Sequence, residues 1–143
     1  MKNDYLIYGL LGVAVLVLIY TVYTLTISPA VPEIKNSNFK TITSGSTDPG
    51  SAQIDLTPIG VDNGMLKVDF AINTHSVDLS QHDLKEITIL EFEGKKLAPV
   101  SAPLLQGHHN SGTLVFNVGK EINKFKITIA GIPNVQERVF EWK

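Results

Sequence analysis

Four histidines are the side chains with the clearest potential for chemistry in this sequence of 143 residues. His75 and His82 flank Asp78 in one polar segment, and His108 and His109 form a pair in a second segment. Imidazole nitrogens and carboxylate oxygens together suit Cu(II), Zn(II) or Ni(II). We expect the two segments to be loops that can meet at one end of a β-sandwich. The sequence therefore offers His75, Asp78, His108 and His109 as ligands for Cu(II) or Zn(II).

A structural role is the alternative for the same histidines. Neighbouring residues of an extended chain point to opposite sides, so His108 and His109 reach one ion only if the loop turns. Gly107 permits such a turn. In the alternative, one imidazole bonds to Asp78 or to a backbone group and fixes the loop, while Thr74 satisfies local amides.

Composition excludes several functional classes. The chain has no cysteine, which rules out disulfides, thiol catalysis, Fe–S clusters and thiolate zinc sites. Its formal net charge of −2 provides no basic field for nucleic acid. No Gly-x-Ser-x-Gly elbow and no glycine-rich phosphate loop occur in the sequence. We therefore expect a protein that is not an enzyme and does not bind nucleic acid.

The N-terminal segment 5–27 carries no charged residue. A helix of about 20 apolar residues crosses a hydrocarbon core of roughly 30 Å, and tyrosines near both of its ends suit the two interfaces. We expect residues 1–27 to form an uncleaved, single-pass anchor in the cell membrane. Because the N-terminal tail is short, we place the C-terminal domain outside the cytoplasm. A removed signal peptide and a pilin-like helix are the alternatives.

Residues 28–52 are rich in Pro, Ser, Thr, Gly and Asn, and the centre of this segment has almost no apolar side chain. Such a composition cannot bury enough apolar surface to fold alone. We expect a flexible linker over 28–52, with packing around Ile34 and Phe39 as the alternative.

From Gln53 to the C-terminus, apolar residues recur with a period of two, which indicates strands rather than helices. Asp62-Asn63-Gly64 is a hairpin signal, because Asn and Gly tolerate positive φ. The expected strands are 53–57, 65–73, 85–92, 95–100, 113–118, 124–130 and 135–142. Short strands at this spacing predict an all-β, immunoglobulin-like β-sandwich over 53–143, preceded by the transmembrane helix and the linker.

Three segments resemble a group of small, uncharacterised prokaryotic domains that follow a membrane anchor or a signal peptide. They are 74–79 (THSVDL), 107–116 (GHHNSGTLVF) and 137–142 (ERVFEW). The resemblance covers 53–143 and implies a discrete β-sandwich module without an established activity. If the group shares a site, the matching positions are His75, Asp78, His108 and His109. Gln106 departs from the glycine that commonly precedes the histidine pair.

Together these features predict a membrane-anchored, extracytoplasmic binding module or an accessory subunit of an envelope complex. Its partners would be the membrane, through residues 5–27, and another envelope protein. A histidine-based domain that binds or delivers copper or zinc is the first alternative. A pilus-like structural subunit is the second.

Overall fold

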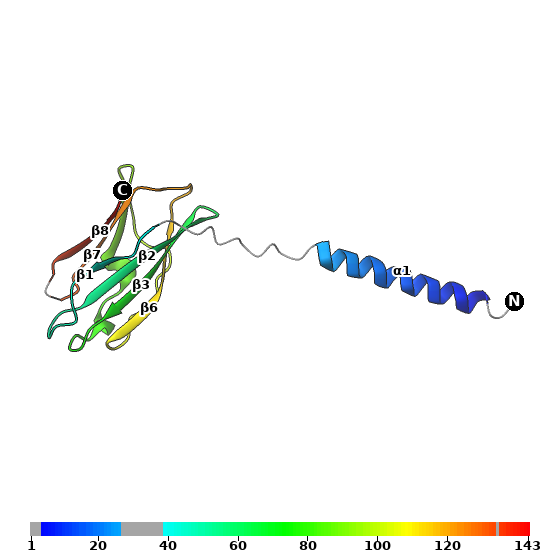
Figure 1. Cartoon of the computed structure of the whole chain (residues 1–143), viewed down its shortest axis with the longest axis horizontal. Helices are drawn as coiled ribbons and strands as arrows, with labels where there is room; N and C mark the ends of the chain where they lie inside the picture. Colours follow the sequence, from blue (N-terminus) through cyan, green and yellow to red (C-terminus); the bar gives the residue numbers. More distant parts are fainter. Residues whose placement is uncertain (1–3, 27–38, 134) are drawn as a thin grey trace. The chain divides into compact units, whose positions relative to one another are not determined.

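The computed structural model describes residues 4–26, 39–133 and 135–143. The chain divides into two compact units, Met1–Glu33 and Ile34–Lys143, and each is considered by itself. The first contains helix α1 (Asp4–Thr26), whose side chains are described over 8–23 (Figure 1). The large apolar side chains of that stretch are exposed. Within the described part of the chain, no helix is both long and apolar enough to cross a membrane.

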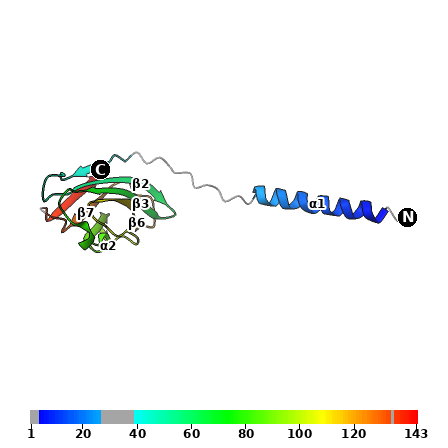
Figure 2. The ribbon, with the colours of Figure 1, turned by 90° about the horizontal axis from the view of Figure 1, so that it is seen from below.

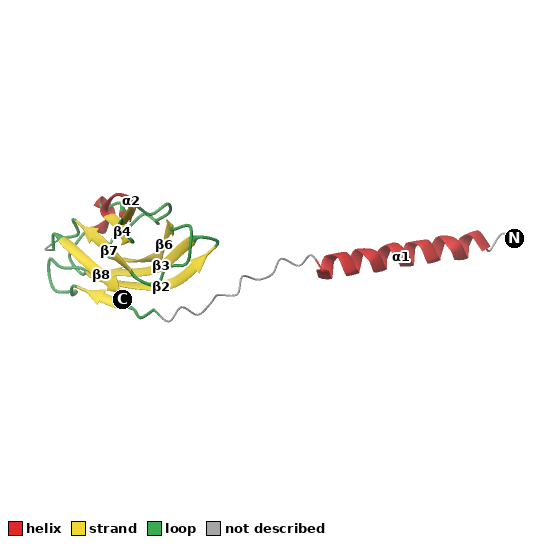
Figure 3. Cartoon of the chain, turned by 90° about the horizontal axis from the view of Figure 1, so that it is seen from above, coloured by secondary structure: helices red, strands yellow, loops and turns green. Residues whose placement is uncertain are grey.

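The described residues of the second unit form two four-stranded antiparallel sheets, so this part of the chain is all-β. Figures 2 and 3 show the sheets as two layers. Sheet A has the order β1 (Ile42–Ser44), β2 (Gln53–Asp62), β3 (Met65–Asn73) and β6 (His109–Asn117). Sheet B has the order β5 (Lys95–Leu97), β4 (Thr88–Phe92), β7 (Phe125–Ala130) and β8 (Glu137–Trp142).

Alternation along the strands builds the core between the two sheets. In β3, Leu66, Val68, Phe70 and Ile72 are buried, as the period of two predicts. The inward sets of β6 and β7 are also buried, namely Leu114, Phe116, Phe125, Ile127 and Ile129. These side chains belong to one continuous hydrophobic cluster. Burial of one face of each sheet therefore sets the register of the strands.

The hairpin predicted at residues 62–64 is present between β2 and β3. Asn63 has φ 50° and Gly64 has φ 76°. Positive φ at both central residues is typical of a type I′ turn, whose twist matches that of the flanking strands. Asp62 and Met65 are the last paired residues on either side of the turn.

The sandwich begins before Gln53, within the segment that the sequence assigns to a linker. Strand β1 pairs with β2, and the Thr43 hydroxyl donates to the Asp55 carboxylate at 2.6 Å. The Phe39 and Phe125 rings meet edge to face with centroids 5.3 Å apart. Strand pairing thus incorporates a segment that is too polar to form a core of its own. Ile34, the other proposed packing position, lies outside the described residues.

Several other boundaries differ from the predicted ones. Strand β2 continues to Asp62 instead of ending at 57, and β5 ends at Leu97 instead of 100. Strands β7 and β8 begin one and two residues later than expected. The strand expected over 85–92 begins as the short helix α2 (Leu84–Ile87), and only its second half is β4. Asp83 causes this start, because its carboxylate accepts a hydrogen bond from the Lys85 amide at 2.8 Å as a helix N-cap. Strand β6 begins at His109, four positions earlier than expected, because it pairs with β3 along its whole length.

The strand registers define two opposite ends of the sandwich. The histidine end comprises the loops 45–52, 74–83, 105–108 and 131–136 (except residue 134), together with the strand ends next to them. The attachment end comprises residues 39–40, the turns 62–64 and 93–94, the loop 118–124 and the C-terminal residues Trp142 and Lys143. Trp142 closes the attachment end, because its indole Nε1 donates to the Lys40 carbonyl at 2.8 Å.

Candidate functional site at the histidine end

The structure brings the two histidine segments side by side. The Thr74 amide donates to the His108 carbonyl at 3.0 Å, and the Leu79 amide donates to the Gly107 carbonyl at 3.1 Å. Gly107 has φ 59°, a left-handed conformation that glycine adopts at little cost and that turns the chain into β6. The loops therefore extend the pairing of β3 and β6 beyond the strands.

Thr74 fixes the conformation of this end from the inside. Its side chain is fully buried, and its hydroxyl donates to the Ser51 carbonyl at 2.6 Å. The same oxygen accepts from the Val77 amide at 3.2 Å. Ser76 makes a second connection to the loop 45–52, because its hydroxyl oxygen accepts from the Gly50 amide at 2.6 Å. The loops 45–52 and 74–83 are thus joined by side-chain hydrogen bonds to backbone groups.

His108 and His109 bond on different sides of the β3–β6 pair. His109 lies in register with Asn73, and its Nδ1 is 3.0 Å from the Asn73 Oδ1. Because Leu114 points into the core, the alternation of β6 places His109 on the outer face of sheet A. His108 instead places its Nδ1 2.9 Å from the carbonyl oxygen of Val77, in the loop beyond the strands.

Asp78 is occupied as a local cap. Its carboxylate accepts from the Ser80 amide at 3.0 Å and from the Ser80 hydroxyl at 2.7 Å, at the start of the 3₁₀ helix η1 (Leu79–Gln81). These hydrogen bonds lower the pKa of Asp78 below its usual value, and the nearby imidazoles of His108 and His82 lower it slightly further.

The four predicted ligands do not form one metal-binding group. Among the described residues, no three His, Cys, Asp or Glu side chains are placed to hold one ion. Of the four, His75 and His109 come together, with ring centroids 6.2 Å apart and planes at 79°. His108 bonds instead to the Val77 carbonyl, and Asp78 caps η1.

The pair retains some capacity to coordinate. A carbonyl-type oxygen can only accept, so the Asn73 Oδ1 makes the His109 Nδ1 the donor in this contact. The Nε2 of a neutral His109 then carries the free lone pair, which is the arrangement that orients histidine ligands in metal sites. The His75 side chain is exposed beside it.

Arg138 is a residue of this end that the sequence reading missed. It is 2% exposed, and its guanidinium donates to the carbonyls of Ile132 at 2.9 Å, Ala52 at 3.3 Å and Pro133 at 3.3 Å. Burial lowers the pKa of this guanidinium. The alternation of β8 could have revealed it, because Arg138 lies on the same face of the strand as the buried residues Phe140 and Trp142.

No family model, curated protein or solved structure matches this chain. The resemblance to the group of small prokaryotic domains therefore stays a prediction.

Proposed function

We propose that this chain is a membrane-anchored, extracytoplasmic binding module or accessory subunit of an envelope complex. In this proposal, the histidine end is the surface that contacts an envelope protein. Segment 5–27, which has no charged residue, would hold the chain in the cell membrane. A binding role of this kind requires no catalytic step.

One observation carries the proposal. The side chains of Thr74 and Ser76 link the loops 45–52 and 74–83, and backbone hydrogen bonds link 74–83 to 105–108. These loops lie at the end of the sandwich opposite Phe39, the first described residue of the second unit. Loops that a rigid scaffold holds in place are common recognition surfaces, because little conformational entropy is lost when they bind. Exposed imidazoles and the nearby exposed carboxylate of Asp78 provide polar contacts there.

We propose an immunoglobulin-like fold only in the sense that two sheets are layered. In immunoglobulin sheets the second strand pairs with the fifth. Here β2 pairs with β3, its neighbour in the sequence, so the strand order is different.

Site-specific photocrosslinking on the full chain in its native membrane tests this function. A photoreactive residue at Gln106, exposed at the histidine end, should give one discrete product with another protein. The matched control carries the same group at Thr128, on the outer face of sheet B. Identical products from both positions would contradict the proposed binding surface, and release of the chain by alkaline carbonate would contradict the anchor.

The contact between His75 and His109 supports a second candidate function, the binding of Cu(II) or Zn(II). Titration calorimetry of an untagged chain should show binding that is lost in His109→Ala and retained in His82→Ala. His82 is the control, because it lies in the same loop system outside the pair. Equal binding by both variants would exclude a metal site at this pair. Absence of binding by the parent chain and by both variants would exclude it as well.

A further inference from the structure

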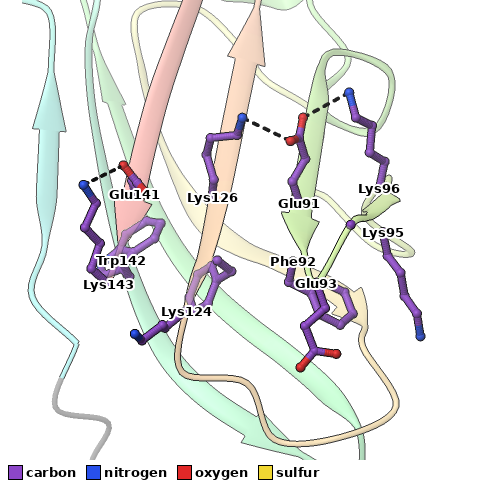
Figure 4. Close-up of a pocket in the computed structure, with 12 residues that line it drawn as sticks. Glu91, Phe92, Glu93, Lys95, Lys96, Lys124, Lys126, Glu141, Trp142 and Lys143 are labelled. Carbon is purple, nitrogen blue, oxygen red and sulfur yellow. Dashed lines mark ion pairs between the residues drawn. The ribbon is translucent and has the colours of Figure 1, made fainter.

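A groove of about 520 Å³ lies at the attachment end, at the opposite end of the sandwich from the histidines. It is lined by the β4–β5 hairpin, the start of β7 and the C-terminal residues (Figure 4). The charged residues that line it are Lys95, Lys96, Lys124, Lys126, Lys143, Glu91, Glu93 and Glu141. Five lysines and three glutamates give this lysine groove a net charge of +2.

Ion pairs leave part of this positive charge uncompensated. Glu91 is shared between Lys126 at 3.0 Å and Lys96 at 3.2 Å, which lie on the strands at either side of it. Glu93 is paired with Lys120, from outside the groove, at 2.6 Å. Among the described residues, no carboxylate forms an ion pair with Lys124, whose side chain is exposed.

Lys95 is also exposed, and its ammonium lies 5.8 Å from the centroid of the Phe92 ring rather than in an ion pair with a described residue. In Figure 4 the side chains of Lys95 and Lys124 extend away from the paired residues. The lysine groove therefore presents two cations that form no ion pair with a described carboxylate.

Charge is segregated between the two ends of the sandwich. The loops and adjoining strand ends of the histidine end carry Asp48, Asp55, Asp78, Asp83, Glu86 and Glu137. The described basic residues there are exposed Lys85 and buried Arg138. The formal charge of −2 for the whole chain thus conceals a basic lysine groove and an acidic histidine end.

The lysine groove adjoins the place where the chain joins the sandwich. Glu141, Trp142 and Lys143 line the groove and also line a second hollow, of about 440 Å³, with residues 39–42. Exposed Lys40 adds a further positive charge there. The sequence leaves residues 27–38 between α1 and Phe39, a segment that can span at most about 43 Å.

We propose that the lysine groove docks the sandwich onto anionic lipid headgroups of the membrane that holds the N-terminal segment. The proposal rests on the membrane anchor of the proposed function, and it adds a defined docking face. An ammonium group is a compact point charge, which suits headgroup phosphates without a fixed geometry. Lysines close to a membrane anchor are attracted to anionic lipids over about one Debye length. In the docked state the acidic histidine end faces away from the bilayer.

Trp142 provides the measurement, because it is the one tryptophan of the chain and it lines the groove. The full chain is reconstituted into vesicles of phosphatidylcholine alone, or of phosphatidylcholine mixed with phosphatidylglycerol. Both contain a lipid whose headgroup accepts energy from tryptophan. We expect energy transfer to be about twofold higher with the anionic lipid and to fall at high salt.

A matched pair of variants separates docking from general charge. Lys124→Glu should lose most of the increase with anionic lipid. Lys85→Glu makes the same charge change at an exposed position of the histidine end and should retain the increase. Lys95→Glu serves as a second groove variant, and circular dichroism checks that each variant folds.

The possible results distinguish this inference from the proposed anchor. Equal energy transfer in both lipid mixtures overturns the docking face, and so does an equal reduction in both matched variants. Either result counts against docking even when carbonate fails to extract the chain. If carbonate extracts the chain, the anchor is wrong, but salt-sensitive, Lys124-dependent recruitment to anionic vesicles still supports the groove. A response to soluble polyglutamate without a response to anionic vesicles would indicate an acidic protein partner and overturn lipid docking.

Discussion

The two ends of the sandwich are held together by different kinds of interaction. At the histidine end, buried Thr74 and Arg138 bond to backbone groups of neighbouring loops. Near the attachment end, opposite charges face each other across strands, as where Lys126 lies in register with Glu91 on one side and Glu141 on the other. Buried polar groups are costly to leave unpaired, whereas exposed ion pairs contribute little to stability. We therefore expect substitutions to be far more destabilising at the histidine end.

The largest expected effect is that of Arg138→Met in the unit 34–143. The substitution would remove the donor to the carbonyls of Ile132, Ala52 and Pro133. Unpaired buried carbonyls should lower the free energy of unfolding by about 2–4 kcal/mol, measured by urea denaturation. Exposed Lys85→Met is the control and should change it by less than about 0.5 kcal/mol. Equal effects of the two substitutions would show that the buried hydrogen bonds of Arg138 do not stabilise the histidine end.

Thr74→Val should have the next largest effect, because the shape of the side chain is kept while the hydroxyl is lost. The Ser51 carbonyl and the Val77 amide would both lose a partner. We expect a loss of about 2 kcal/mol in the free energy of unfolding, with faster hydrogen exchange in the loops 45–52 and 74–83. Thr128→Val, on the half-buried outer face of sheet B, is the control. Unchanged exchange in both loops would show that Thr74 does not join them.

Trp142→Phe tests a part-buried side-chain hydrogen bond to the backbone at the attachment end. The indole stacks on Phe125 with centroids 5.0 Å apart and donates to the Lys40 carbonyl. Phenylalanine keeps an aromatic ring but cannot donate, so we expect a loss of about 1–2 kcal/mol. Proteolysis near residue 40 should become faster, and the histidine end should keep its exchange protection. A global loss of protection would show that the two ends are not independent.

Acid pH should produce the smallest effect and should act at both ends. The pKa of Asp78 is lowered by hydrogen bonds from Ser80, and that of Glu91 by hydrogen bonds from Lys126 and Lys96. A carboxyl group with a lowered pKa in the folded state stabilises the fold above its unfolded pKa. That contribution is lost as the pH falls below the ordinary pKa, 3.8 for Asp78 and 4.5 for Glu91, and through the lower folded pKa.

Urea denaturation at several pH values should therefore show a shallow decline in stability on acidification. Asp78→Asn and Glu91→Gln should each make the decline less steep. Added salt should weaken the contribution of Glu91 more than that of Asp78, because ion pairs of exposed lysines are screened. A steeper decline in either variant would contradict these assignments.

Local patterns predicted the buried faces of most strands but not the beginning of the domain. Leu66 to Ile72 and Phe125 to Ile129 are buried where alternation placed them, because one face of each strand must leave water. Segment 39–44 has no such pattern. It joins the sandwich through Thr43, which bonds to Asp55, and through the ring of Phe39. Contacts with residues distant in the sequence decide such a segment, and a short window cannot show them.

The candidate site was predictable only in part. The sequence identified the two histidine segments, and its opposite-sides rule for His108 and His109 agrees with their separate partners, Val77 and Asn73. It did not show that His75 would meet His109 while Asp78 capped η1. Those outcomes depend on the register of β3 against β6 and on the capping of a short helix.

The sequence by itself determined the alternation of the strands, the turn at Asn63-Gly64 and the uncharged N-terminal segment, because these depend on neighbouring residues. Only the tertiary structure decided which charges and imidazoles share a surface. Sheet pairing gathers the lysines of β5, β7 and the C-terminus around Glu91 of β4 at one end, and the loops with the histidines at the other. The reason is physical: backbone pairing and burial of the core set the register, and the exposed side chains follow that register.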